Sequence, residues 1–370
     1  MARLGDYVNI KTGKLDANAS SENGAYPFFT CSVTPLKIDT YSYDCECVLV
    51  AGNGDLNVKY YNGKFDAYQR TYIIESKDKT VLLVPYVYCF LDKYVETLRK
   101  QSIGGVIKYI KLGNLTDATI PIYDIKKQKE IVSKLDFVDS LITARREQLA
   151  KLDELVKSRF IEMFGDPRNY PNSFNVVTFN DCVEYMGDIG SNGANKVVVD
   201  HLDMKDEEDY ALMVRFLNFT KNDFTDDVKY VSKEAYDFFK KSQIFGGELI
   251  ICKIGSAGQN YVMPYLNRPV SLGLNQIMVR INNRTIMPYL YHYLNSDYGK
   301  QLIDGCINGA VTKSITKTEL KKIPVIVPPI ELQNQFATFV EQTDKSKFEI
   351  QQSLEKLETL KKALMQKYFG

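Results

Sequence analysis

The sequence predicts a mixed α/β (α+β) protein in which two related globular domains alternate with two long helices. The two halves of the chain repeat each other, and the offset between matching residues is 203 at Pro85/Pro288 and 205 at Gln128/Gln333. Each half ends in a run of roughly 35 to 40 residues with the apolar spacing of a coiled coil. Before that run, short β-rich segments are separated by turn residues. Such a duplication predicts two copies of one fold with approximate twofold symmetry.

The composition excludes disordered and fibrous proteins. The 370 residues correspond to about two domains, and 45% hydrophobic with 12% aromatic residues is enough for buried cores. Lys and Arg number 47 against 46 Asp and Glu, which is a formal net charge of +1. A uniformly basic protein is therefore excluded, and any surface for nucleic acid must be a local patch.

No part of the chain is typical of a membrane protein or a secreted one. No run approaches the ~18 consecutive apolar residues of a membrane span, and residues 1–13 lack the apolar core of a signal peptide. We therefore expect a cytoplasmic protein with no membrane partner. The seven cysteines lack the paired spacing of a disulfide framework or a zinc site, which favours reduced thiols.

The inventory of motifs predicts that this chain has no catalytic residues and binds no metal. It contains two histidines, His201 and His292, and neither lies in an H-E-x-x-H pattern. Phosphate-binding, nucleophile-elbow and dinucleotide-binding motifs are missing as well. The sequence also lacks the Asn/Asp-Pro-Pro-Tyr/Phe motif that resembles the active site of amino-methyltransferases. We expect His292 to be a core residue of a buried helix.

The first domain, residues 1–124, is expected to contain a strand at 47–51, a turn at Gly52-Asn53-Gly54 and a helix at 86–100. Amide, lysine and aromatic groups on the loop after the strand suit phosphate contact and hydrogen bonding to base edges. Solvated turns have a similar composition, so that alternative stays open. The loop candidates are Asn53, Asp55, Asn57, Lys59, Tyr60 and Tyr61.

The first long helix, residues 125–165, is expected to end at Gly165-Asp166-Pro167, because glycine takes the left-handed capping geometry and proline cannot continue a helix. At ~1.5 Å per residue such a helix is roughly 50 to 60 Å long, which suits a spacer. Leu149 and Leu152 are its predicted central seam residues.

The second domain, residues 166–329, repeats this plan with a strand at 249–252, a glycine loop after it and a helix at 287–302. The second long helix covers residues 330–370, with Leu354 and Leu357 in its seam. Its seam has Lys347 where the first helix has Ile142, which suggests that the two helices pair with each other as an antiparallel coiled coil. The loop candidates of this domain are Lys253, Ser256, Gln259, Asn260 and Tyr261.

The order of the repeated motifs resembles the specificity (S) subunit of type I restriction-modification systems, over essentially the whole chain. Each half carries Ile-Gly/Asn-Gly, then Ile-Pro, then Gln128 or Gln333, then the leucine-spaced helix that closes on Phe-Gly. The resemblance implies two target-recognition domains that each read one half of a split, asymmetric double-stranded DNA site. It also implies that the helices set the length of the unread spacer.

The same resemblance implies that all chemistry resides on partner subunits. Two methyltransferase (M) subunits would use S-adenosylmethionine to methylate adenine N6, and restriction (R) subunits would add an ATP- and magnesium-dependent endonuclease. Self-association of the chain is expected when these partners are absent.

Two aligned pairs are the predicted base readers, because Asn and Gln read adenine bidentately and Arg reads guanine. Gln69-Arg70 is aligned with Asn275-Gln276 at the start of two strand-like runs. Capping of a strand edge is the competing explanation for these residues. Four further residues are predicted phosphate contacts, although surface lysines are often merely solvated: Lys64, Lys100, Gln101 and Lys313.

A second class of function also fits the repeat, namely a scaffold that binds no DNA and recruits proteins through its coiled coil. Salt dependence separates the two, because counterion release makes DNA binding steeply salt-dependent. A fused nuclease or methylase is disfavoured by the missing motifs.

Overall fold

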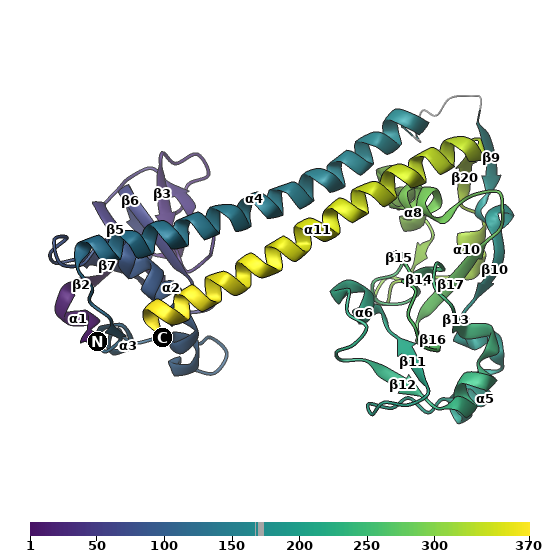
Figure 1. Ribbon diagram of the computed structural model, residues 1–370, viewed down its shortest axis with the longest axis horizontal. Helices are drawn as coiled ribbons and strands as arrows, with labels where there is room; N and C mark the ends of the chain where they lie inside the picture. Colours follow the sequence, from purple (N-terminus) through teal and green to yellow (C-terminus); the bar gives the residue numbers. More distant parts are fainter. Residues whose placement is uncertain (167, 169–173) are drawn as a thin grey trace. The chain divides into compact units, whose positions relative to one another are not determined.

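The computed structural model describes residues 1–166, 168 and 174–370, so that Pro167 of the predicted helix stop lies outside the described residues. The chain divides into two compact units (Figure 1). Unit 1 comprises residues 1–148 and 349–370, and unit 2 comprises residues 149–348. Each unit therefore contains a globular body and one stretch of each long helix.

The body of unit 1 is a six-stranded sheet with strand order β2-β7-β5-β6-β3-β4. All its pairs are antiparallel except β3 with β6. Helix α2 spans Val84–Gln101 with Pro85 in its first turn, which confirms the predicted helix. The strands are β2 (Val8–Thr12), β3 (Tyr26–Phe29), β4 (Leu36–Ile38), β5 (Tyr43–Ala51), β6 (Val58–Ala67) and β7 (Thr71–Ser76). The short elements are β1 (Ala2–Arg3) paired with β8 (Thr119–Ile120), α1 (Leu4–Tyr7), a 3-10 turn (Ala17–Ala19) and α3 (Leu112–Thr116).

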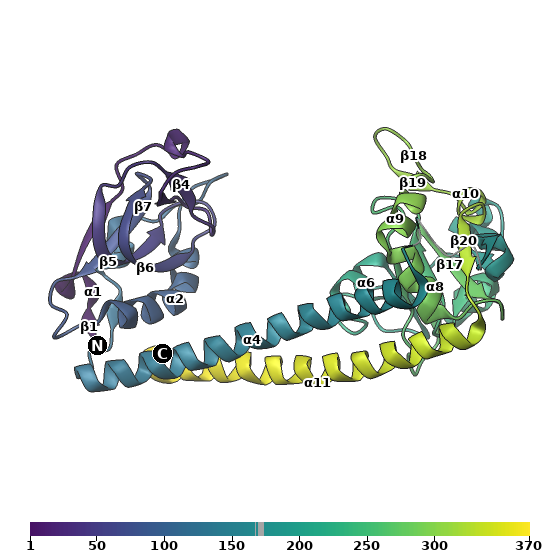
Figure 2. The same cartoon turned by 90° about the horizontal axis from the view of Figure 1, so that it is seen from above.

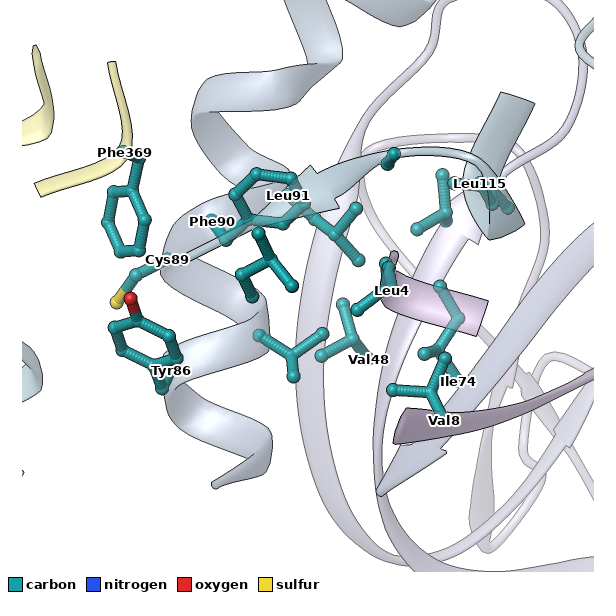
Figure 3. Close-up of a cluster of buried hydrophobic side chains, with 14 of the residues drawn as sticks. Leu4, Val8, Val48, Ile74, Tyr86, Cys89, Phe90, Leu91, Leu115 and Phe369 are labelled. Carbon is teal, nitrogen blue, oxygen red and sulfur yellow. The ribbon is translucent and has the colours of Figure 1, made fainter. Parts of the chain in front are cut away.

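The core of unit 1 joins this body to the end of the second long helix. Figure 3 shows Phe369 beside Tyr86 and Phe90 of α2, with ring centroids 5.2 Å and 6.0 Å away. The buried hydroxyl of Tyr86 donates a hydrogen bond to the carbonyl of Pro121 at 2.9 Å. Leu4, at 0% exposure, completes the packing toward the sheet. The Phe-Gly end of the second repeat is therefore a core segment of unit 1.

The body of unit 2 has two four-stranded sheets, β10-β17-β14-β15 and β12-β11-β16-β13, and two short pairs, β20-β9 and β18-β19. The strands are β9 (Asn175–Thr178), β10 (Val183–Gly187), β11 (Ala211–Val214), β12 (Lys229–Val231), β13 (Gln243–Ile244), β14 (Leu249–Cys252), β15 (Asn260–Val262), β16 (Val270–Leu272), β17 (Gln276–Ile281), β18 (Ile307–Asn308), β19 (Ser314–Ile315) and β20 (Pro324–Val327). The helices are α5 (Asn195–His201), α6 (Phe216–Lys221), α7 (Lys233–Phe238), α8 (Met287–Asn295), α9 (Asp297–Asp304) and α10 (Lys317–Lys321), with 3-10 turns at Phe179–Cys182, Ile189–Asn192 and Lys240–Ser242.

The single helix predicted at 287–302 is wrong, because the structure has two helices there. Helix α8 ends at Asn295 and α9 begins at Asp297, with Ser296 extended between them. The Ser296 hydroxyl accepts a hydrogen bond from the backbone N–H of Gly299 at 3.1 Å, so it caps α9. A serine that caps a new helix competes with continuation of the old one.

Helices α4 (Ile125–Phe164) and α11 (Ile330–Phe369) have 40 residues each and begin at the predicted positions. Within each unit they run side by side and antiparallel, which confirms that prediction (Figure 1 and Figure 2). In unit 1, Asp139 pairs with Lys361 at 2.8 Å and Arg146 with Glu358 at 2.7 Å. In unit 2, Asp153 pairs with Lys347 at 2.7 Å and the Phe160 and Phe336 rings lie 5.4 Å apart.

The predicted seam leucines are enclosed to different degrees. Leu354 is 7% exposed, and Leu149, Leu152 and Leu357 are half-buried. Leu155, by contrast, is 48% exposed and lies off the seam. Of the described residues, no helix is both long enough and apolar enough to cross a membrane.

A buried glutamine ties the start of each long helix to its own body in the same way. The Gln128 side chain accepts a hydrogen bond from the N–H of Leu83 at 2.9 Å and donates to the carbonyls of Val81 and Tyr123, both at 2.8 Å. Its counterpart in unit 2 is Gln333, and both glutamines are fully buried. The same structural role in both units explains why the buried glutamine occurs in both halves of the sequence.

His292 lies on α8, as predicted, but it is half-buried and not a full core residue; its ring lies 5.3 Å from that of Phe336. Burial and the nearby charge of Lys347 together lower the pKa of His292 to about 4, against the opposing effect of Asp153. The unfolded chain therefore takes up this proton at higher pH than the folded chain does.

Between pH 6.5 and 4, acidification should thus remove stability that His292 contributes at neutral pH. We expect His292→Asn to lose less stability than the wild type when urea unfolding midpoints are compared at pH 7 and pH 4.5. Equal losses in both proteins would contradict this assignment.

Candidate nucleic-acid interface

In each unit, the loop that follows a central strand is hydrogen-bonded through its backbone to the residue that precedes a neighbouring strand. In unit 1, Gly52 follows strand β5, and its N–H donates to the carbonyl of Arg70 at 2.8 Å. In unit 2, Lys253 follows strand β14, and its N–H donates to the carbonyl of Asn275 at 2.7 Å. Arg70 immediately precedes β7, and Asn275 immediately precedes β17.

A hairpin is attached to each glycine loop by two further backbone hydrogen bonds that also match. In unit 1, Ile110 N–H donates to Gly52 O and Gly54 N–H donates to Lys108 O, both at 2.9 Å. In unit 2, Ile315 N–H donates to Lys253 O at 3.0 Å, and Gly255 N–H donates to Lys313 O at 3.4 Å. We call these three segments the reading frame; it comprises residues 52–57, 69–70 and 102–111 in unit 1, and residues 253–260, 274–275 and 306–315 in unit 2.

The structure corrects the alignment of the predicted base readers by one residue. Ala51 pairs with Thr71 and Cys252 pairs with Gln276, so Gln276 corresponds to Thr71 and both are 1% exposed. The side-chain oxygen (Oε1) of Gln276 accepts a hydrogen bond from the backbone N–H of Gly273 at 3.2 Å. Gln276 therefore lies inside the body, and Arg70 corresponds to Asn275 on the surface.

Arg70 and Asn275 are exposed polar side chains at matching places in the two reading frames. Neither side chain makes a hydrogen bond or ion pair with any described residue, whereas the neighbouring Gln69 amide donates to Asp16 at 2.7 Å. Asn275 has φ +60°, a left-handed conformation that asparagine tolerates better than most residues. It lines a cavity of about 430 Å³ together with Ser256 and Arg215.

Several predicted loop residues of unit 1 lie elsewhere than on the loop. Lys59, Tyr60 and Tyr61 belong to strand β6, because the Val-Lys-Tyr-Tyr segment extends the sheet. The Tyr61 hydroxyl donates to the Lys64 carbonyl at 3.3 Å, and the ammonium of Lys64 lies 4.6 Å from the ring of Tyr41.

Asn57 and Lys59 are engaged with each other beside the glycine loop. Asn57 donates to the carbonyl of Cys31 at 2.8 Å, and Lys59 donates to the Asn57 side-chain oxygen. Burial lowers the pKa of Lys59. At the end of α2, Lys100 is exposed, and Gln101 is exposed while it accepts a hydrogen bond from Asn114 at 3.1 Å.

In unit 2, Lys253 is held by an acidic partner. Lys253 and Lys317 each hydrogen-bond to the carboxylate of Asp188 at 2.9 Å, and that side chain is 9% exposed. Burial alone raises the pKa of Asp188, but hydrogen bonds from the two lysines and Ser191 outweigh it and lower the pKa to about 2. This cluster anchors the glycine loop to residue 188.

The remaining candidates of unit 2 divide between interior and surface. Asn260 begins β15, is 6% exposed and accepts a hydrogen bond from Asn295 at 2.7 Å. Ser256 is half-buried, whereas Gln259 and Lys313 are exposed. The surface candidates thus converge on the glycine loop and the hairpin.

The hairpin tips, around Val106 and Val311, are surface features that the residue-by-residue prediction missed. The signal was in the sequence, because the repeated Ile-Gly/Asn-Gly motif opens both tips.

The chain belongs to the family described as the type I restriction modification DNA specificity domain, whose model matches residues 1–154 and 187–362. The fold class and the pair of matched reading frames agree with this assignment.

Individual relatives are similar over different lengths. The chain is 35% identical over 154 residues to the type I restriction enzyme EcoDI specificity subunit of Escherichia coli, a match that spans 42% of this chain and 34% of that protein. It is 21% identical over 332 residues to the putative specificity subunit S.HindORF215P of Haemophilus influenzae, over 86% of this chain and 80% of that protein.

Solved structures share the fold. The S subunit of the type I restriction-modification system from M. genitalium superimposes with a TM-score of 0.63 at 16% identity, over 100% of this chain and 95% of that one. A chain from a structural study of complex assembly and conformational transition of the type I R-M system gives a TM-score of 0.55 at 15% identity, over 100% and 96%.

Proposed function

We propose that this chain is the DNA-recognition subunit of a type I restriction-modification complex and that each unit reads one half of a bipartite site. The observation that carries the proposal is the reading frame, which is built twice with the same backbone hydrogen bonds but presents Arg70 in one unit and Asn275 in the other. An arginine reads guanine through O6 and N7, and an asparagine reads adenine through N6 and N7. The two half-sites therefore differ, and the whole site is asymmetric.

The paired helices fit two further roles in this proposal. As stiff rods, α4 and α11 would set the number of base pairs left unread between the half-sites. They would also recruit two methyltransferase subunits, which carry S-adenosylmethionine, and restriction subunits, which use ATP and magnesium. The near-neutral charge of this chain is compatible with such partners, because they can supply part of the phosphate contact.

The test is to co-express the chain with an adenine methyltransferase encoded beside it and to map methylated adenines on genomic DNA by single-molecule sequencing. We expect a split motif with two unlike half-sites and a fixed gap, of which one side alone changes when residues 1–124 are exchanged. A stable complex that methylates no DNA, together with no salt-dependent DNA binding, would favour the scaffold.

Arg70→Ala should relax recognition at one guanine of one half-site only. Loss of a bidentate contact costs about 1–3 kcal/mol of discrimination, or about 5- to 150-fold. Methylation rates on duplexes with each base at that position measure it. Asn275→Ala should act only on an adenine of the other half-site.

Arg3→Ala is the matched control, because Arg3 is also an exposed arginine of unit 1 and pairs with Asp117 outside the reading frame. It should leave both half-sites unchanged. If Arg70→Ala keeps the wild-type base preference, Arg70 is not a base reader.

A further inference from the structure

Both units expose a valine at the tip of the hairpin in the reading frame. Val106 is 104% exposed and Val311 is 98% exposed, and each lies two residues after the positive-φ glycine of its hairpin, Gly104 or Gly309. Figure 2 shows the β18–β19 hairpin standing clear of the rest of unit 2. Side chains this exposed contribute little to the stability of the fold, and here they recur at the tip of the same hairpin in both units.

The backbone conformation of both tips is well defined. Gly104 has φ +114° and Gly309 has φ +102°, and a Cβ on either would lie within 2.5 Å of a backbone oxygen across the tip. Ile103 and Tyr109 exchange backbone hydrogen bonds at 3.0 Å and 2.8 Å below the first tip. In unit 2 the corresponding bridge joins Asn308 to Ser314. Both tips are therefore tight turns that close a short antiparallel β-pair.

The two hairpin segments carry basic residues and no acidic ones. Residues 97–116 contain no Asp or Glu, and residues 305–318 contain none either. The first segment carries four basic residues, of which Arg99 is paired with Glu96 and Asp55. The second carries two, of which Lys317 is paired with Asp188. Lys108 and Lys313 are exposed, and their own carbonyls accept the bonds from Gly54 and Gly255. An apolar tip beside unpaired lysines matches the groove and phosphates of DNA better than an apolar protein surface.

We propose that the two hairpins enter a groove of the DNA beside each half-site, with Val106 and Val311 against sugars and base edges and with Lys108 and Lys313 on phosphates. The inference rests on the proposed function and assigns different contacts to different parts of each unit. The valine and the lysine are the same in both units, whereas the side chain before the strand differs between Arg70 and Asn275. The hairpin contact is therefore independent of base sequence, and the reading position supplies specificity.

The test compares full-length chains, alone and with the co-expressed methyltransferase, on a cognate duplex and a scrambled one. Val106→Asp/Val311→Asp should weaken binding to both duplexes by the same factor, about tenfold or more, and leave the methylated motif unchanged. Lys108→Gln/Lys313→Gln should reduce the slope of log K against log salt by about 2, one for each phosphate contact. Because the tips are exposed, neither double variant should shift the urea unfolding midpoint.

Val199→Asp is the matched control, since Val199 is 71% exposed on α5, outside the reading frame; it should bind DNA as the wild type does. Unchanged affinity in the tip variants, a changed motif, or loss of methyltransferase assembly with intact DNA binding would each overturn the inference while the proposed function stands. A wild-type chain that binds and methylates no DNA would instead overturn the proposed function.

Discussion

Replacing Phe336 by alanine should lower the free energy of unfolding of unit 2 by about 3–5 kcal/mol, the usual cost of deleting a fully buried aromatic ring. Phe336 is 0% exposed. Its ring packs 5.4 Å from Phe160 and 5.5 Å from Phe164, and both lie on the other long helix. The cavity would therefore open where α4, α11 and the body of unit 2 meet.

Urea unfolding followed by hydrogen exchange measures this loss and assigns it to unit 2. Phe348→Ala is the control, because Phe348 lies on the same helix and is 65% exposed. We expect that control to change stability by less than about 0.5 kcal/mol. Equal effects of the two substitutions would show that Phe336 is not a core residue.

Gln333→Ala should also be severely destabilising, by about 2–6 kcal/mol. The Gln333 side chain accepts a hydrogen bond from the N–H of Ile286 at 3.1 Å and donates to the carbonyl of Pro328 at 2.9 Å. Removal of the amide leaves both backbone groups buried without this partner, and each such group costs about 1–3 kcal/mol. The start of α11 should then detach from the segment before α8.

Amide exchange at Ile286 and in the first turns of α11 measures this detachment directly. Gln342→Ala, which removes an exposed glutamine of the same helix, is the control. Gln128→Ala should produce the matching defect in unit 1. If amide exchange at the start of α4 in that variant equals that of the wild type, Gln128 does not hold this helix to the body.

Much of the architecture was predictable because it depends on local periodicity. The seam of each long helix recurs every three or four residues, and it correctly predicted α4, α11 and their antiparallel pairing. The central strands β5 and β14 were recognisable as β-rich runs that end at turn residues. The break at Ser296 was missed, because a serine is compatible with both a helix interior and a helix cap.

The candidate site was less predictable, because exposure of one polar residue depends on distant segments. Lys253 meets Asp188, 65 residues away, and Asn260 meets Asn295, 35 residues away. The pairing of β5 with β7 and of β14 with β17 then decides which residue precedes each strand, and a shift of one position separates buried Gln276 from exposed Asn275.

By itself, the sequence determined that this protein is a duplication with two long seam-bearing helices and a family signature repeated in order, since these properties belong to the order and spacing of residues. Only the tertiary structure decided which polar groups reach the surface, because strand register and long-range hydrogen bonds place Arg70, Asn275 and the two hairpin tips in equivalent reading frames.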